Sequence, residues 1–118
     1  MQPYTLSRSS GSPLLVTEKA FAATVRAYAE ALGWTVWLTW RSVHSPAGEP
    51  DLRMVRPPRV LFVELKSAKG KLTPAQVEAR DLLMGCPGVE YYLWRPQDWP
   101  EIEKALACWN IGCGAQER

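Results

Sequence analysis

Two apolar runs decide the fold: Gly48-Glu49-Pro50-Asp51-Leu52-Arg53-Met54-Val55 and Val60-Leu61-Phe62-Val63-Glu64-Leu65-Lys66. A turn at Pro57-Pro58-Arg59 joins them, so they are predicted to form a β-hairpin. Residues on a strand alternate faces, so Glu64 and Lys66 point the same way and Leu65 points into the opposite layer. Asp51 opens the first strand, at the end that is expected to lie beside the end of the second. The hairpin is therefore expected to bring two carboxylates and an ammonium group together.

These three side chains have two interpretations. A divalent cation prefers oxygen ligands of this kind, and a nearby lysine can orient or deprotonate a water molecule. Alternatively, Glu64 and Lys66 form an exposed ion pair on a strand, which contributes roughly 0 to 1 kcal/mol. The placement favours the first interpretation, because a charged pair that ends the most apolar strand in the chain is costly unless something uses it.

Composition bounds the class of protein. At 118 residues the chain is expected to form one domain, and its 47% apolar and 22% charged content is that of an ordinary soluble globular protein. The formal net charge of +2 is only mildly basic, so a polyanionic partner must be met by a local cluster of cations.

Cysteine usage and hydropathy indicate the compartment. The three cysteines, Cys86, Cys108 and Cys113, are an odd number without Cys-x-x-Cys spacing. This argues for a reducing compartment and against a disulfide scaffold or a zinc site. Neither a signal peptide nor a spanning helix is visible in the sequence, so a cytoplasmic protein without a membrane partner is expected.

The chain is predicted to consist of a flexible arm over 1–16, one domain over 17–110 and a tail over 111–118. Thr17 is the expected N-cap of a first helix with Glu18 in its first turn, and Gly33 ends that helix. Its apolar stripe is Phe21, Val25, Tyr28 and Leu32. The run 34–40 is rich in Trp, Val, Leu and Thr, which is typical of a strand.

Capping signals predict the second half. Thr73-Pro74-Ala75-Gln76 has the form of a capping box for a helix that runs to Met84, and 89–94 reads as a further strand. Asp98-Trp99-Pro100-Glu101 is expected to cap a last helix with Ile102, Ala105, Leu106 and Trp109 on one face. The order αβββαβα predicts a three-layer α/β (α+β) architecture with a small mixed sheet, in which the last strand lies parallel to its neighbour.

The motifs in this order resemble a known family. Gly48-x-Pro50-Asp51-Leu52, 60–66, Gly70-Lys71-Leu72-Thr73-Pro74-Ala75-Gln76 and Tyr92-Leu93-Trp94-Arg95-Pro96 are similar to the VRR-NUC family, the virus-type replication and repair nucleases of the PD-(D/E)XK superfamily. The likeness extends from about residue 17 to about residue 106. It implies the restriction-endonuclease-like fold, and the chain looks like the stand-alone phage members. Those are homodimeric, divalent-metal-dependent DNA endonucleases associated with branched DNA such as Holliday junctions.

The resemblance also implies roles for single residues. Asp51 and Glu64 would bind Mg²⁺ or Mn²⁺ together with the main-chain carbonyl of Leu65, and Lys66 would position the attacking hydroxide. Glu18 would reach the metal directly or through water, although an acid in a first helical turn also suits the helix dipole. Gln76 would face the site, although it already serves the predicted capping box.

Several further residues keep two interpretations. Lys69 and Lys71, with Arg41 and Lys19 behind them, are candidate phosphate contacts, or else they are solvated surface cations. His44 could touch phosphate or metal, or be incidental. Glu49 departs from the family pattern and either adds an acid near the metal or faces solvent. Trp37 and Trp109 are expected in core or interface positions rather than as stacking platforms for single-stranded bases.

These features favour a structure-selective DNA endonuclease that nicks branched DNA in phage replication or repair, and then works in the host cytoplasm. Two alternatives stay open. One is a catalytically weak DNA-binding or assembly module of the same fold. The other is a phosphodiesterase that acts on RNA or nucleotides with the same chemistry.

Overall fold

The computed structural model describes residues 17–39 and 47–109. Within these ranges the elements follow the predicted order. They are α2 (Glu18–Ala31), β1 (Thr35–Leu38), β2 (Leu52–Arg56), β3 (Arg59–Leu65), α3 (Pro74–Met84), β4 (Val89–Trp94), a short 3-10 helix η2 (Pro96–Asp98) and α4 (Trp99–Ala107).

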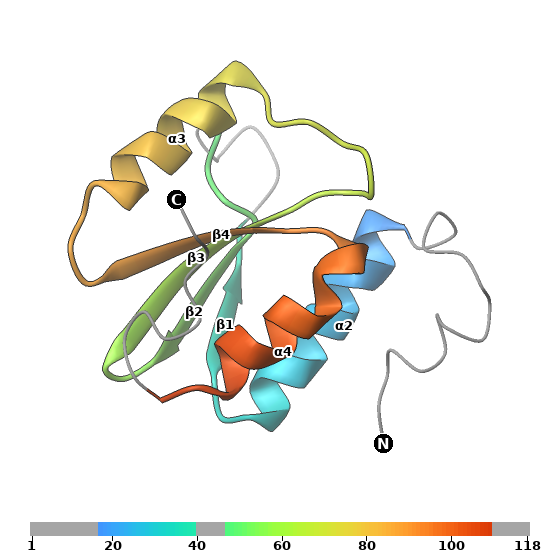
Figure 1. The fold of residues 1–118 in the computed structure, drawn as a ribbon, viewed down its shortest axis with the longest axis vertical. Coiled ribbons are helices and arrows are strands. Elements are labelled where there is room, and N and C mark those ends of the chain that lie inside the picture. The colour runs from blue at the N-terminus through green and yellow to red at the C-terminus, as the bar shows by residue number, and fades with distance from the viewer. Residues whose placement is uncertain (1–16, 40–46, 110–118) are drawn as a thin grey trace.

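One four-stranded sheet forms the middle layer, in the order β1-β2-β3-β4. The pairs β1·β2 and β2·β3 are antiparallel, whereas β3 and β4 are parallel, because α3 carries the chain back to the end where β3 began. Figure 1 shows α2 and α4 on one face of the sheet and α3 on the other. The predicted three-layer mixed architecture is therefore confirmed.

The core lies between the sheet and the α2·α4 layer. Alternate residues of the central strands point into it, namely Leu52, Met54, Leu61, Val63 and Leu65. The predicted stripe of α2 covers them through Phe21 and Val25, with Ala29 added, while Tyr28 and Leu32 pack at its margin. Because a strand alternates faces, the residues between the core positions of β3, Phe62 and Glu64 among them, lie on the α3 face.

The helix starts follow their capping signals, with one correction. Thr17 caps α2 by accepting from the Ala20 backbone N–H at 3.0 Å, and Thr73 forms the predicted capping box with Gln76. Asp98 makes no side-chain cap on α4; instead its Oδ2 accepts from the Arg95 backbone N–H at 2.9 Å. Asp98 therefore stands at the predicted N-cap position of α4, but the predicted side-chain cap is absent because its carboxylate bonds within η2 instead.

Two tryptophans can be compared with their predicted core or interface positions, and the placement of Trp109 on the last helix needs correction. Trp109 lies beyond the end of α4, is 66% exposed and covers the Arg56 guanidinium at 3.8 Å, so it does not belong to the apolar face of that helix. Trp37 is likewise largely exposed, on the edge strand β1, with the Arg53 guanidinium 6.0 Å from its ring centre. Neither side chain is in the core.

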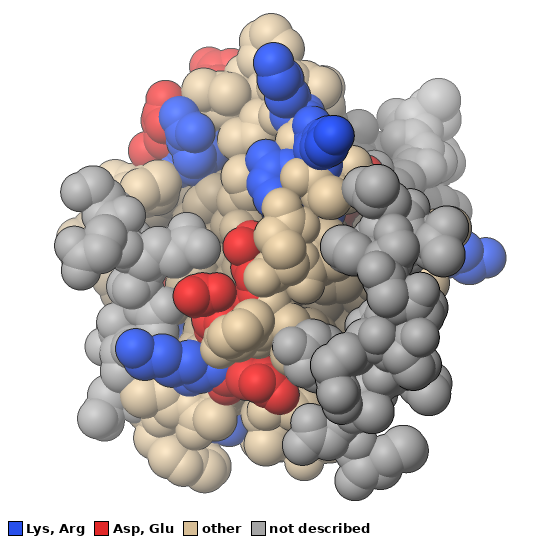
Figure 2. Space-filling view, turned by 45° about the vertical axis from the view of Figure 1, so that its right-hand side comes forward, with Lys and Arg blue, Asp and Glu red and all other residues tan. Residues whose placement is uncertain are grey.

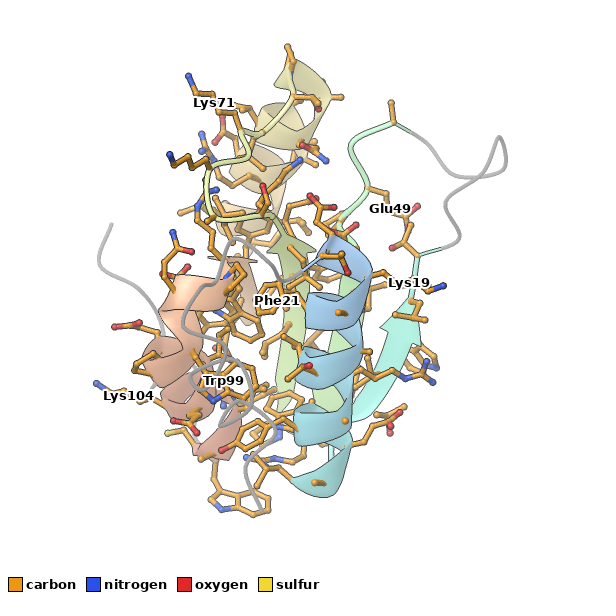
Figure 3. The ribbon with its side chains drawn as sticks, turned by 90° about the vertical axis from the view of Figure 1, so that its right-hand side faces the viewer. Lys19, Phe21, Glu49, Lys71, Trp99 and Lys104 are labelled. Atoms are coloured by element: carbon orange, nitrogen blue, oxygen red, sulfur yellow. The ribbon has the colours of Figure 1, made fainter. Side chains whose placement is uncertain are left out.

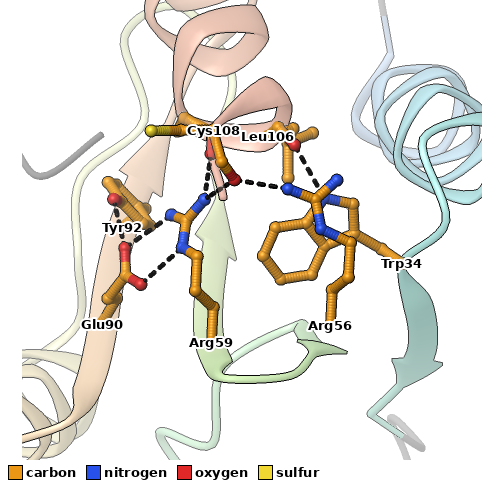
Figure 4. Close-up of polar contacts among 8 residues, drawn as sticks. Trp34, Arg56, Arg59, Glu90, Tyr92, Leu106 and Cys108 are labelled. Carbon is orange, nitrogen blue, oxygen red and sulfur yellow. Dashed lines mark hydrogen bonds and ion pairs between the residues drawn. The ribbon is translucent and has the colours of Figure 1, made fainter. Parts of the chain in front are cut away.

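A buried charge network closes the end of the sheet at the β2–β3 turn (Figure 4). Arg59 is 0% exposed and holds the Glu90 carboxylate through two bonds, Nε to Oε2 at 2.8 Å and Nη2 to Oε1 at 2.7 Å. Its Nη1 donates to the Ala105 and Cys108 carbonyls at 2.6 and 2.7 Å, at the C-terminal end of α4. Burial alone lowers the pKa of Arg59, but the bonds and charge of Glu90 more than offset this, so its pKa is raised.

Arg56 makes equivalent contacts at the C-terminal end of α2. Its Nη1 donates to the Leu32 carbonyl at 2.9 Å and its Nη2 donates to the Cys108 carbonyl. Trp34 donates its indole N–H to Leu106 at 2.8 Å and packs its ring against both guanidinium groups. Two arginines therefore satisfy carbonyls at the C-terminal ends of two helices, where the helix dipole favours positive charge.

Two further predictions can be compared with the structure, and others fall outside the residues that it describes. Cys86 has an exposed free thiol, but Cys108 is disulfide-bonded, so the expected reduced state is wrong at that position. In the described ranges, no helix is both long and apolar enough to cross a bilayer. The predicted arm and tail, Trp40, Arg41 and His44 lie outside the described residues.

Candidate active site

Strand register brings Asp51 and Glu64 together. Leu52 pairs with Val63, so one further step along the antiparallel ladder sets Asp51 opposite Glu64. The Asp51 carboxylate Oδ2 accepts from the Leu65 backbone N–H at 2.8 Å, so a side chain takes over where main-chain pairing with β2 has ended. Both acids are buried, Asp51 at 8% and Glu64 at 1% exposure. The predicted pairing of the two carboxylates beside Leu65 is thus present.

Gln76 links α3 to this pair. Its Nε2 donates to Glu64 Oε2 at 3.1 Å, across the sheet-to-helix interface. Its Oε1 at the same time accepts from the Thr73 backbone N–H at 2.9 Å and completes the capping box. The capping contact and the position facing Glu64 therefore coexist, because one end of the amide serves each.

Gly48 lets the Asp51 segment lie against α3. Its φ is +88°, and a Cβ built there would meet the Ala75 carbonyl oxygen at 2.4 Å. A side chain at this position would both strain the backbone and push the two segments apart. On the other side, the Thr39 backbone N–H donates to the Asp51 carbonyl at 2.8 Å, which fixes the segment to the end of β1.

A hollow of about 960 Å³ opens between α2 and the sheet, and Asp51 is the member of the acid pair that lines it. Its lining includes Glu18, Lys19 and Arg26 from α2 and Leu38, Asp51 and Leu65 from the sheet. Figure 2 shows acidic side chains grouped in the middle of one face of the molecule, with basic side chains above them and to the lower left. Glu18 and Asp51 thus line the same cavity, while the metal contact predicted for Glu18 stays a prediction.

The available oxygen donors suit an ion such as Mg²⁺ or Mn²⁺ that takes only some of its ligands from the protein. Mg²⁺ usually takes one or two carboxylates and fills the rest of its octahedron with water and phosphate. Within the described part of the chain, no three Asp, Glu, His or Cys side chains converge closely enough to hold an ion together. Asp51 and Glu64 fit as the two carboxylates, with the Leu65 main chain between them, and Glu18 would then act through water. Glu49 is half-buried in the segment before Asp51.

The predicted cations lie on the segment that follows β3. Lys66 is half-buried directly after β3, and its backbone N–H donates to the Trp94 carbonyl at 3.0 Å. Lys69 and Lys71 are exposed on the loop that leads to α3, and Figure 3 shows Lys71 at the α3 end of the molecule. Lys19 extends from the start of α2, where it helps line the hollow.

Tyr91 is a residue near the site that the sequence analysis missed. It is 7% exposed, and its buried hydroxyl has no hydrogen-bond partner among the described residues. The pKa of Tyr91 is raised to about 12, chiefly by burial and also by the charge of Glu64, while the charge of Arg80 opposes the shift. The signal was available in part, because alternation along β4 sets residue 91 on the α3 face with Glu64.

Comparison with solved structures finds a VRR_NUC domain with a TM-score of 0.61. The two chains are 21% identical, and the alignment covers 79% of this chain and 97% of the other. At this identity the likeness concerns the fold, which agrees with the resemblance inferred from the motifs. The sequence matches no family model and no curated protein.

Proposed function

We propose that this protein is a divalent-metal-dependent nuclease that hydrolyses phosphodiester bonds in DNA. The observation that carries the proposal is the buried pair Asp51 and Glu64, set opposite each other by strand register, with Lys66 at the end of the same strand. The likeness in fold to a VRR_NUC domain, which covers 79% of this chain and 97% of that one, supports this class of reaction.

The protein's own residues would divide the work as follows. Asp51, Glu64 and the Leu65 carbonyl hold the ion, and Gln76 orients the Glu64 carboxylate through its 3.1 Å contact. A bound Mg²⁺ or Mn²⁺ supplies Lewis acidity toward a phosphate oxygen and lowers the pKa of water. Lys66 directs the attacking water toward phosphorus and offsets the negative charge that builds there. Lys69 and Lys71 contact the phosphate backbone beyond the reacting group.

The experiment is cleavage of labelled DNA substrates with Mg²⁺, Mn²⁺ or EDTA. Asp51→Asn keeps an oxygen that can accept from the Leu65 N–H but removes the charge that holds the ion, and Lys66→Met removes the ammonium group. Both variants should lose activity by a factor of about 100 or more, in line with the loss of one main electrostatic contact. Lys104→Met is the matched control, because Lys104 is an exposed cation on α4, away from Lys71 in Figure 3.

The substrate panel tests the finer proposals. Four-way junction, flap, duplex and single-stranded DNA are compared with single-stranded RNA, and junction DNA is expected to be cut best, by a homodimer that addresses two strands. Sedimentation of the active species measures the dimer. If no DNA is cut under any metal while junction binding persists, the protein is a binding module of the same fold. Metal-dependent cutting of RNA alone would assign it to the RNA phosphodiesterases.

A further inference from the structure

One arginine outside the acid pair holds the loop that follows β3. Arg95 comes directly after β4, and its Nη1 donates to the Ser67 carbonyl at 2.9 Å and to the Gly70 carbonyl at 2.6 Å. The same loop closes on itself through the Gly70 N–H, which donates to Ser67 at 3.3 Å. A single guanidinium nitrogen thus fixes both ends of the turn 67–70.

Neighbouring contacts fix the position of Arg95 and extend its hold on the loop. The Asp98 carboxylate accepts from the Arg95 backbone N–H at 2.9 Å, within the η2 turn. Gln97 donates its Nε2 to the Ala68 carbonyl at 3.1 Å. The carbonyls of Ser67, Ala68 and Gly70 therefore accept from side chains of the β4–α4 connection.

The charged side chains of this loop are all basic. The stretch 65–77 contains Lys66, Lys69 and Lys71 and no acidic residue. Carbonyl oxygens carry partial negative charge, and those of Ser67, Ala68 and Gly70 are occupied by side-chain donors on the inner side. The Arg95 guanidinium donates to neutral carbonyls and, among the described residues, pairs with no carboxylate, so it adds to the positive potential.

Continuity with the acid pair gives the loop its role. Lys66 begins the loop and lies two residues after Glu64 of the acid pair. Its backbone N–H donates to the carbonyl of Trp94, one residue before Arg95. We propose that Arg95 is a positioning residue, which holds the loop 66–71 in the shape that receives the phosphodiester backbone next to the reacting group. The inference rests on the proposed function but assigns to Arg95 a task that the acid pair does not require.

The first test is DNA binding measured by fluorescence anisotropy in EDTA, with labelled junction and duplex DNA. Arg95→Met should weaken binding about 10-fold or more, whereas Lys104→Met, which removes the same charge elsewhere, should stay within about 2-fold. Arg95→Lys should recover part of the loss, because one ammonium nitrogen can donate to both carbonyls. Thermal unfolding of each variant shows whether the fold is retained.

A double-mutant cycle separates positioning from direct contact. Lys69→Ala/Lys71→Ala is measured in the wild-type and in the Arg95→Met background. If Arg95 positions the lysines, their removal costs several-fold less affinity in the Arg95→Met background. Equal losses in both backgrounds would overturn the proposal and make Arg95 an independent phosphate contact or a general stabiliser.

Hydrogen exchange of the Gly70 amide adds a readout that needs no DNA. Arg95→Met should speed its exchange while the β3 amides stay protected. Unchanged exchange would overturn the proposal even if the protein cuts DNA. If wild-type protein neither binds nor cuts nucleic acid, the proposed function fails first, and faster Gly70 exchange would then report a brace without a substrate role.

Discussion

Replacing Arg59 with methionine would test how the buried charge network holds the fold. The change removes four hydrogen bonds from a side chain that is 0% exposed, two to Glu90 and one each to the Ala105 and Cys108 carbonyls. Glu90 retains the Tyr92 hydroxyl at 2.7 Å, and Cys108 retains Arg56. The methionine keeps most of the aliphatic volume, so the measured loss reports the polar contacts.

Breaking one side of a buried ion pair costs about 3 to 5 kcal/mol, because the remaining charge stays in a poorly solvated site. A domain of this size has a total stability of roughly 5 to 15 kcal/mol. At about 4 °C or more per kcal/mol, the midpoint of thermal unfolding should fall by at least about 12 °C. Chemical denaturation of the wild-type protein and of Arg59→Met measures the difference in free energy of unfolding directly.

Arg26→Met is the matched control. Arg26 also pairs with a carboxylate, Glu30 at 3.1 Å, but the two side chains are 44% and 48% exposed. Its loss should change stability by no more than about 0.5 kcal/mol. The reasoning is refuted if Arg59→Met costs as little as the control, or if Arg59→Met and Glu90→Gln destabilise additively in the double variant, since a coupled buried pair must show a large interaction energy.

Three further predictions concern the residues around the acid pair. Tyr91→Phe should leave stability unchanged or raise it by up to about 1 kcal/mol, because the lost hydroxyl has no partner. The folded pKa of about 12 exceeds the ordinary value of 10.0, so the folded state holds this proton more tightly. The stability that this tighter proton binding contributes is complete below pH 10 and is lost as the pH rises toward 12. The free energy of unfolding should therefore fall less steeply with pH in Tyr91→Phe than in the wild type across that range, and an identical slope would contradict the shift. Gly48→Ala should destabilise by more than Gly88→Ala, since both glycines have positive φ but only Gly48 faces a backbone atom within 3 Å; equal losses, each of about 1 kcal/mol from φ strain, would exclude the packing argument. Gln76→Glu keeps an oxygen for the Thr73 N–H but replaces the donor to Glu64 by a like charge. Its helix content by circular dichroism should match the wild type while its metal-dependent cleavage falls about 10-fold or more, and full activity would show that the contact is dispensable.

Much of the architecture could be predicted because its signals are local. Thr17 and Thr73 mark the starts of two helices, because their own side chains cap them. Two-residue alternation on either side of Pro57-Pro58 indicates the register of the hairpin. That register also brought Asp51 to Glu64, since one antiparallel pairing fixes every later one. The start of the last helix was predicted less well, because the Asp98 side chain accepts from the Arg95 N–H in η2 and makes no cap on α4, and the sequence does not show which of the two it serves.

The sequence by itself determined the order of elements, the hairpin and the acid pair, because each depends on spacing within one segment or between adjacent ones. Only the tertiary structure decided the rest. From the sequence, Arg59 is predicted only as a turn residue. In the structure it binds Glu90 of β4 and carbonyls at the end of α4. From the sequence, Arg95 is only the residue that follows a strand, whereas in the structure it donates to carbonyls of the loop 67–70. A buried guanidinium is stable only when several distant donors and acceptors meet, and their meeting point depends on how layers pack rather than on any local pattern.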